Sequence, residues 1–191
     1  ILVITGDHGE VINDRMDIHG HPRHHHYDEL LRVPLIIRVP ETDGQRIDQP
    51  VSLAWIPRVI TNLVELTCGD FPADYERISV LGESNSSTPP VISDSLDRHG
   101  HTISIRNETH KLISHESDNN TLKTQYPYFN DDIVFRYRTD PTEREPQSSD
   151  LPQQLCEIVQ DIATDKQRIP NIKGTFSKQV TQQLKDLGYK M

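Results

Sequence analysis

Two continuous apolar runs stand near the start of the chain. Residues 1–5, Ile-Leu-Val-Ile-Thr, end at Gly6, and residues 33–39, Val-Pro-Leu-Ile-Ile-Arg-Val, end at Pro40. Short runs of this kind predict strands buried on both faces of a parallel sheet. Between them, residues 27–32 predict a short helix after a polar loop.

Residues 54–66 follow a different pattern, with apolar side chains at helical intervals. Pro57 fits the first turn of a helix, because a proline there gives up an N–H that has no partner in the helix anyway. A helix after two such strands indicates an α/β sheet with crossover connections.

Beyond residue 67 the pattern changes to short β-type runs between turn-rich segments. Antiparallel strands are predicted at 91–92, 102–105, 111–114 and 133–137. A turn at 139–145 precedes amphipathic helices predicted at 151–163 and 175–187. The second half is therefore expected to form a small antiparallel sheet with helices.

Composition and charge narrow the function classes. The 191 residues are 34% hydrophobic and 26% charged, which predicts a globular protein with a modest core. A net charge of -9 argues against a nucleic-acid partner, which would require clustered Lys and Arg. Cys68 and Cys156 show no metal or redox spacing, which favours a reducing, cytoplasmic location. No apolar run reaches the ~20 residues of a membrane span.

Asp7 and His8 follow the first predicted strand directly. Open parallel sheets present reactive residues at the carboxyl ends of their strands. A carboxylate beside an imidazole can ligate a divalent cation, with Asp suiting Ca²⁺ or Mg²⁺ and His favouring Mn²⁺ or Zn²⁺. The plain alternative is a turn in which Asp7 caps a nearby amide.

The next loop is rich in histidine, with imidazoles at His19, His21, His24, His25 and His26. Such a density suits proton transfer or contact with an anion. A solvated loop or an adventitious metal-binding tract would show the same pattern.

In order, these features resemble the sulfatase family of the alkaline phosphatase superfamily. The resemblance rests on Gly-Asp-His-Gly-Glu at residues 6–10, Gly-His-Pro at 20–22 and Tyr-Asp-Glu-Leu-Leu-Arg-Val-Pro at 27–34. Residues 50–53, 135–145 and 184–189 are similar to later family segments, although Trp55 stands where Asp is usual and Arg58 where Thr is usual.

The resemblance implies roles for particular residues. Asp7 and His8 match the family's metal pair, with Ca²⁺ the expected cation and Mg²⁺, Mn²⁺ or Zn²⁺ as alternatives. His21 matches the loop residue that contacts the sulfate or protonates the leaving oxygen. The spacing from His21 to the following helix is one residue longer than expected, so His24 or His25 could take this role and bind substrate.

The resemblance also implies the fold class and domains. We expect an α/β protein containing part of an alkaline-phosphatase-like mixed sheet with flanking helices, plus a small C-terminal antiparallel sheet with a helix. Residues 1–70 would belong to the catalytic domain and residues 71–191 to a C-terminal subdomain. Arg32 is expected to be structural and to pair with Asp28 or Glu29.

The implied function is metal-dependent hydrolysis of a sulfate ester, but the implied nucleophile is missing. Family members convert a Cys or Ser within Cys/Ser-x-Pro-x-Arg to formylglycine, and no such motif occurs here. Because the chain begins with an inner strand and no Met, we expect the C-terminal part of a longer sulfatase, inactive alone and dependent on the remainder of its own chain.

Two alternatives remain open at this stage. A phosphodiesterase, a phosphonate hydrolase or a phosphate-ester transferase of the same superfamily would share the Asp-His turn. A noncatalytic remnant or binding protein would keep the fold without the chemistry.

Overall fold

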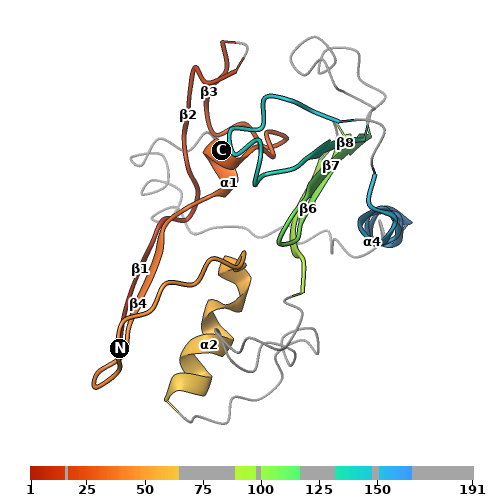
Figure 1. Cartoon of the computed structure of the whole chain (residues 1–191). Coiled ribbons are helices and arrows are strands. Elements are labelled where there is room, and N and C mark those ends of the chain that lie inside the picture. Colours follow the sequence, from red (N-terminus) through yellow and green to blue (C-terminus); the bar gives the residue numbers. More distant parts are fainter. Residues whose placement is uncertain (16, 65–88, 98–99, 117–131, 148–150, 165–191) are drawn as a thin grey trace, which may run out of the picture.

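The largest sheet has four antiparallel strands in the order β5-β6-β7-β8 (Figure 1). The computed structural model describes residues 1–15, 17–64, 89–97, 100–116, 132–147 and 151–164. The strands are β5 (Val91–Asp97), β6 (Gly100–Arg106), β7 (Lys111–Glu116) and β8 (Ile133–Phe135). All four predicted strands are confirmed, and β5 extends well beyond the predicted residues 91–92.

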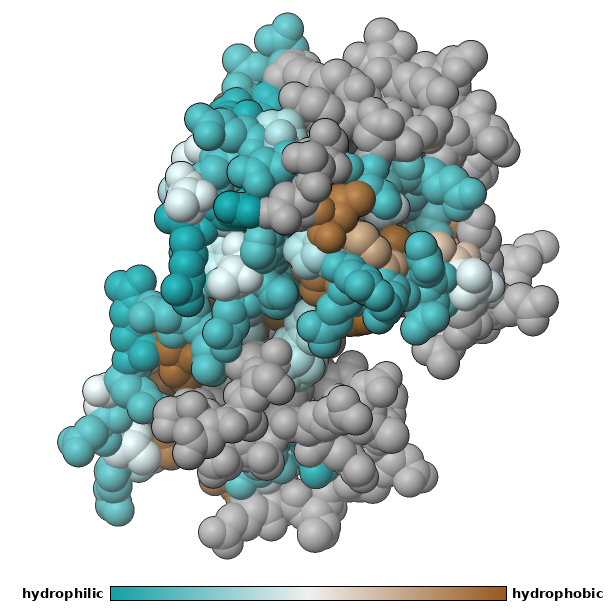
Figure 2. All heavy atoms as spheres, turned by 45° about the vertical axis from the view of Figure 1, so that its right-hand side comes forward, coloured by the Kyte–Doolittle hydropathy of each residue, from teal (hydrophilic) through white to brown (hydrophobic). Residues whose placement is uncertain are grey.

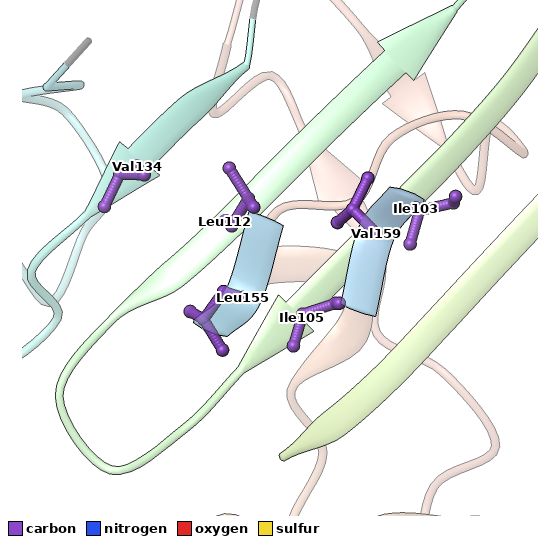
Figure 3. Close-up of a cluster of buried hydrophobic side chains, with 6 residues drawn as sticks. All are labelled: Ile103, Ile105, Leu112, Val134, Leu155 and Val159. Atoms are coloured by element: carbon purple, nitrogen blue, oxygen red, sulfur yellow. The ribbon is translucent and has the colours of Figure 1, made fainter. Parts of the chain in front are cut away.

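One face of this sheet is apolar and carries helix α4 (Gln153–Thr164). Ile103 and Ile105 alternate along β6 and point to the same side, because successive strand residues face opposite sides of a sheet. Figure 3 shows the buried cluster that results, formed by Ile103, Ile105, Leu112, Val134, Leu155 and Val159. The helix predicted at 151–163 is thus confirmed, and it covers the sheet.

The other face of the sheet is largely polar and contacts residues 24–28. Thr102 and Ser104 of β6 form hydrogen bonds with His24 and His26 on this side. Tyr27 packs here in a second small core with Ile113, Ile133 and Phe135. The sheet therefore lies between α4 and the N-terminal part of the chain.

The first predicted strand pairs differently from the expectation. β1 (Leu2–Thr5) and β4 (Leu35–Arg38) form an antiparallel pair in which Leu2 faces Arg38, so the predicted parallel pairing is wrong. Parallel strands need a long crossover connection. Here the Gly9 N–H donates to Leu30 O at 2.7 Å, which draws the segments next to the two strands together as in a wide hairpin.

The predicted burial of this first strand is also wrong. Leu2 is 54% exposed, Ile4 51% and Ile36 58%, because β1 and β4 are the only strands of this sheet among the residues that the structure describes. Figure 2 shows hydrophobic atoms reaching the surface among hydrophilic ones. The apolar run predicts that a strand is suited to burial, but it does not specify the neighbouring strands and helices that would cover the two faces of that strand.

Two short helices, a 3₁₀ turn and a small hairpin complete the N-terminal part. Helix α1 (Asp28–Leu31) confirms the short helix predicted at 27–32. The 3₁₀ turn η1 (Leu53–Trp55) and helix α2 (Ile56–Leu63) confirm the helix predicted at 54–66. Sequence reasoning missed a small hairpin of β2 (Val11–Ile12) and β3 (His19–Gly20) within the predicted loop.

Some predictions fall elsewhere in the chain. The helix predicted at 175–187 lies outside the described residues. The domain boundary predicted at residue 70 also lies outside them and stays a prediction. Within the described residues, none of the helices combines the length and apolar character needed to cross a membrane.

Candidate active site

The turn after β1 is held against α1 by a close backbone approach at Gly9. A Cβ added at Gly9 would lie 2.1 Å from the carbonyl oxygen of Glu29 and 3.0 Å from its carbonyl carbon. Only glycine allows this approach, which also lets the Gly9 N–H reach Leu30 O. The backbone of His8 and Glu10 is thereby fixed next to α1.

The β2–β3 hairpin brings His21 to the same place. Val11 faces Gly20 and Ile12 faces His19, so Glu10 and His21 are opposite each other one step beyond the ladder. Gly20 adopts a φ of +87°, a left-handed conformation that favours glycine. Glu10 Oε2 and His21 Nδ1 lie 3.9 Å apart as a result.

Asp7, His8 and His21 meet in an exposed cluster at the end of β1. His8 Nε2 is 3.7 Å from Asp7 Oδ2, and the rings of His8 and His21 stack with their centroids 4.9 Å apart. One ligand atom from each of His8, Glu10 and His21 lies within 4.8 Å of the others. The structure thus brings together the predicted metal pair and the predicted catalytic His21.

Hydrogen bonds set the chemical state of the first two side chains. The backbone N–H of His8 donates to Asp7 Oδ1 at 3.0 Å and holds the pKa of Asp7 below its usual value. His8 Nδ1 lies 2.7 Å from the carbonyl oxygen of Gly9. A carbonyl oxygen can only accept, so in the neutral ring Nδ1 carries the proton and Nε2 presents its lone pair. The paired atoms Asp7 Oδ2 and His8 Nε2 suit a divalent cation.

Sequence reasoning missed Glu10 as a member of this cluster. The available signal was an acidic side chain only two residues after His8, in the same predicted turn. The turn residues Asn13 and Asp14 between apolar positions would have indicated the hairpin that places Glu10 opposite His21.

The histidines at 24 and 25 lie outside this exposed cluster, and both are buried. His24 Nε2 donates to Asp97 Oδ1 at 3.0 Å, and its Nδ1 lies 2.8 Å from Thr102 Oγ1. His25 Nε2 donates to Glu29 Oε1 at 2.8 Å. The idea that His24 or His25 binds substrate stays a prediction, and the structure gives both rings partners within the protein.

A charged network fixes α1 behind the site. Lys111 Nζ donates to Asp28 Oδ1 at 2.8 Å and to Glu143 Oε1 at 2.7 Å, and Arg106 also donates to Asp28. Burial raises the pKa of Asp28, but Lys111 and Arg106 outweigh this effect and lower it well below its usual value. The network anchors the first turn of α1 to β6 and β7.

The second carboxylate of α1 is held in the same way. Arg15 donates to both carboxylate oxygens of Glu29, and its guanidinium lies 4.0 Å above the centre of the Tyr27 ring. Burial raises the pKa of Glu29, but hydrogen bonds from His25 and Arg15 outweigh it and lower the pKa to about 2. These contacts occupy the carboxylates expected to pair with Arg32, which is itself exposed.

A groove of 1270 Å³ starts at this turn, with Asp7 and His8 in its lining. Arg32, Arg38 and Arg46 also line it. Carboxylates from the loop after β4 share the walls, so the groove is mixed in charge. Its lining thus offers guanidinium groups to an anionic ligand.

Comparisons with known proteins can now be set beside this geometry. Residues 1–66 match the protein family described as Sulfatase. The structure resembles that of BT1596, a 2-O GAG sulfatase, with a TM-score of 0.50 and 17% identity over 85% of this chain and 34% of that one. It also resembles a candidate sulfatase from Bacteroides thetaiotaomicron VPI-5482, with a TM-score of 0.46 and 19% identity over 86% and 35% of the two chains.

The chain therefore spans about a third of the length of the two solved proteins. A comparison with curated protein sequences finds no match. The likeness to BT1596 confirms the predicted fold class, a mixed α/β arrangement with a small antiparallel sheet and helices.

Proposed function

We propose that this chain forms part of the active site of a sulfatase, a sulfuric ester hydrolase that uses a divalent cation. One observation carries the proposal. The segment that matches the Sulfatase family, residues 1–66, contains Asp7, His8 and His21, and the fold gathers these side chains at the end of β1.

The first two residues fit a cation. Asp7 Oδ2 and His8 Nε2 are exposed neighbours, and the hydrogen bond to Gly9 leaves the His8 Nε2 lone pair available. A cation bound there would neutralise charge on the sulfate oxygens. We favour Ca²⁺, which takes six or more oxygen ligands, so the proposed site needs ligands beyond Asp7 and His8.

His21 is the proposed proton donor to the departing oxygen of the ester. Its Nδ1 faces the Glu10 carboxylate at 3.9 Å, so the ring has an acidic neighbour on one side. The ring is exposed and stacks on His8, so it lies beside the proposed cation position. His24 and His25 are less suited to this role because their rings already bind Asp97 and Glu29.

We further propose that the nucleophile comes from residues beyond this sequence. No Cys or Ser in the chain begins the Cys/Ser-x-Pro-x-Arg pattern. The exposed apolar side chains of Leu2, Ile4 and Ile36 would be buried if further strands and helices joined the β1–β4 pair. On this proposal the 191-residue chain alone has no sulfatase activity.

The test uses the native protein at its full length, assayed on an aryl sulfate and on the matching aryl phosphate. The proposal expects faster cleavage of the sulfate. It also expects Asp7→Asn to reduce turnover by removing a ligand of the cation. His21→Asn should reduce turnover by about 10²–10⁴-fold, the usual size of a general acid–base contribution. His19→Asn is the matched control, since His19 is an exposed neighbour in β3.

Three outcomes would count against the proposal. Faster cleavage of the phosphate would favour a phosphodiesterase or phosphonate hydrolase. Unchanged turnover in the Asp7 and His21 variants would remove both residues from the site. A native protein that cleaves neither ester would support a noncatalytic role.

A further inference from the structure

We propose that His8, Glu10 and His21 form a transition-metal site, selective for Zn²⁺ over Ca²⁺. Among the residues that the structure describes, they form the one group of three or more His, Cys, Asp or Glu side chains with ligand atoms within 4.8 Å of one another. The site goes beyond the proposed function, in which Asp7 and His8 face the cation and His21 carries a proton.

The backbone sets this arrangement in advance. His8 and Glu10 both belong to the short segment between β1 and β2, which the contact of Gly9 with α1 holds in place. His21 lies opposite Glu10 because the register of β2 and β3, with Val11 facing Gly20, continues by one step. The three ligands therefore come from two segments that a hairpin holds together.

A hydrogen bond prepares one of the ligands. Histidines that bind zinc usually donate their second ring N–H to a carbonyl or carboxylate, which fixes the tautomer. His8 does this already, with Nδ1 2.7 Å from the carbonyl oxygen of Gly9, so Nε2 is the metal-binding atom. The orientation of Gly9 is itself fixed by its contact with Leu30.

The donor set favours a transition metal. Two imidazoles and one carboxylate suit Zn²⁺, whereas Ca²⁺ requires six or more oxygen ligands. Zinc bonds of about 2.0–2.1 Å at tetrahedral angles place ligand atoms about 3.3 Å apart. All three residues are exposed, so rotation about their side-chain bonds can bring the ligand atoms closer together than the present 4.8 Å. The fourth position would be open to water.

The consequence for catalysis rests on the proposed function. An ion bound to His21 occupies a lone pair of the ring that would carry the proton. Zinc at this site and proton transfer by His21 would therefore exclude each other.

The binding test uses the 191-residue chain and needs no activity. Isothermal titration with Zn²⁺ and then Ca²⁺ measures affinity and stoichiometry, and the visible spectrum of the Co²⁺-loaded chain reports coordination geometry. We expect one Zn²⁺ per chain, weak Ca²⁺ binding, and zinc affinity at least about 10-fold lower in Glu10→Gln and in His21→Asn, since losing even an outer-shell partner costs 10–100-fold.

Two control variants separate this site from its surroundings. His19→Asn removes an exposed histidine of the same hairpin and should leave zinc affinity unchanged. Asp7→Asn removes the charge of the proposed pair with His8, while its amide oxygen can still accept from the His8 N–H. This variant should also leave zinc affinity unchanged.

Two results would overturn the proposal. Full zinc affinity in Glu10→Gln would mean adventitious binding by the ten histidines of the chain. Loss of zinc in Asp7→Asn with retention in Glu10→Gln would assign the ion to the Asp7–His8 pair. Both results come from metal titration, whereas the proposed function is tested by ester hydrolysis, so the failure of this site and the failure of the proposed function are distinguishable.

Discussion

Acid should destabilise the protein through a buried histidine between the N-terminal segment and the sheet. His26 is 2% exposed, and its ring nitrogens lie 3.2 Å from Ser104 Oγ and 2.9 Å from Ser95 Oγ. Hydroxyl groups can serve as donor to one nitrogen and acceptor from the other, so the neutral ring is satisfied. Burial, followed by the charge of Lys111, lowers the pKa of His26 to about 3.

The sign and size of the effect follow from linkage. The pKa of His26 is lower in the folded state than the value of about 6.5 expected in the unfolded chain, so between these values the unfolded state binds more protons. The contribution of His26 to stability is therefore complete above pH 6.5 and is lost as the pH falls toward 3. At pH 5 the loss amounts to about 2 kcal/mol.

Urea denaturation of the wild type and of His26→Gln at pH 8 and pH 5 measures this loss. The variant has no titrating ring at this position, so its stability should fall less on acidification. The difference in unfolding free energy between the two proteins should shrink by about 2 kcal/mol from pH 8 to pH 5.

The comparison between proteins removes the contribution of His115, whose pKa burial lowers to about 4 in both of them. His19→Gln, at an exposed position, should parallel the wild type. An equal difference between wild type and His26→Gln at both pH values would refute the reasoning.

Two substitutions test the framework that holds α1. Lys111→Met would remove the buried cation that pairs with the Asp28 and Glu143 carboxylates. It should lower the free energy of unfolding by about 3–5 kcal/mol, measured by urea denaturation at pH 7. A change near zero would show that the network is not needed. Gly9→Ala would push a methyl group against the Glu29 carbonyl and should lower the free energy of unfolding by about 1–3 kcal/mol in the same assay. Wild-type stability of this variant would contradict the close approach.

The elements that the sequence predicted correctly are those in which local pattern decides the outcome. Ile103 and Ile105 alternate with Thr102 and Ser104, and a period of two fixes both the strand and its apolar face. The amphipathic pattern of residues 151–163 likewise specified the helix that covers this face.

The surroundings of the first strand could not be predicted in this way. An apolar run shows that a strand is suited to burial, but pairing direction depends on how the chain returns. Here the return is set by the contact of Gly9 with Leu30 and by the β2–β3 hairpin. Neither contact leaves a periodic signal in residues 1–5 or 33–39.

The burial of the histidine-rich loop could not be predicted from the local sequence either. The sequence suggested proton transfer, contact with an anion, or a solvated tract. His24 and His26 are instead buried, because Thr102 and Ser104, each 78 residues further along the chain, provide hydrogen-bonding partners. A local window cannot show partners at that distance, so a buried histidine and a solvated one look alike.

A pattern of period two nevertheless joins the two regions. His24, His26 and Asp28 pair with Thr102, Ser104 and Arg106, and every pair is separated by the same 78 residues. The constant offset means that residues 24–28 follow β6 in the same chain direction, with His24, His26 and Asp28 on its polar side. This alignment fixes the start of α1, whose Leu30 carbonyl accepts from Gly9. The polar face of a sheet formed much later in the chain thereby positions the turn that carries Asp7 and His8.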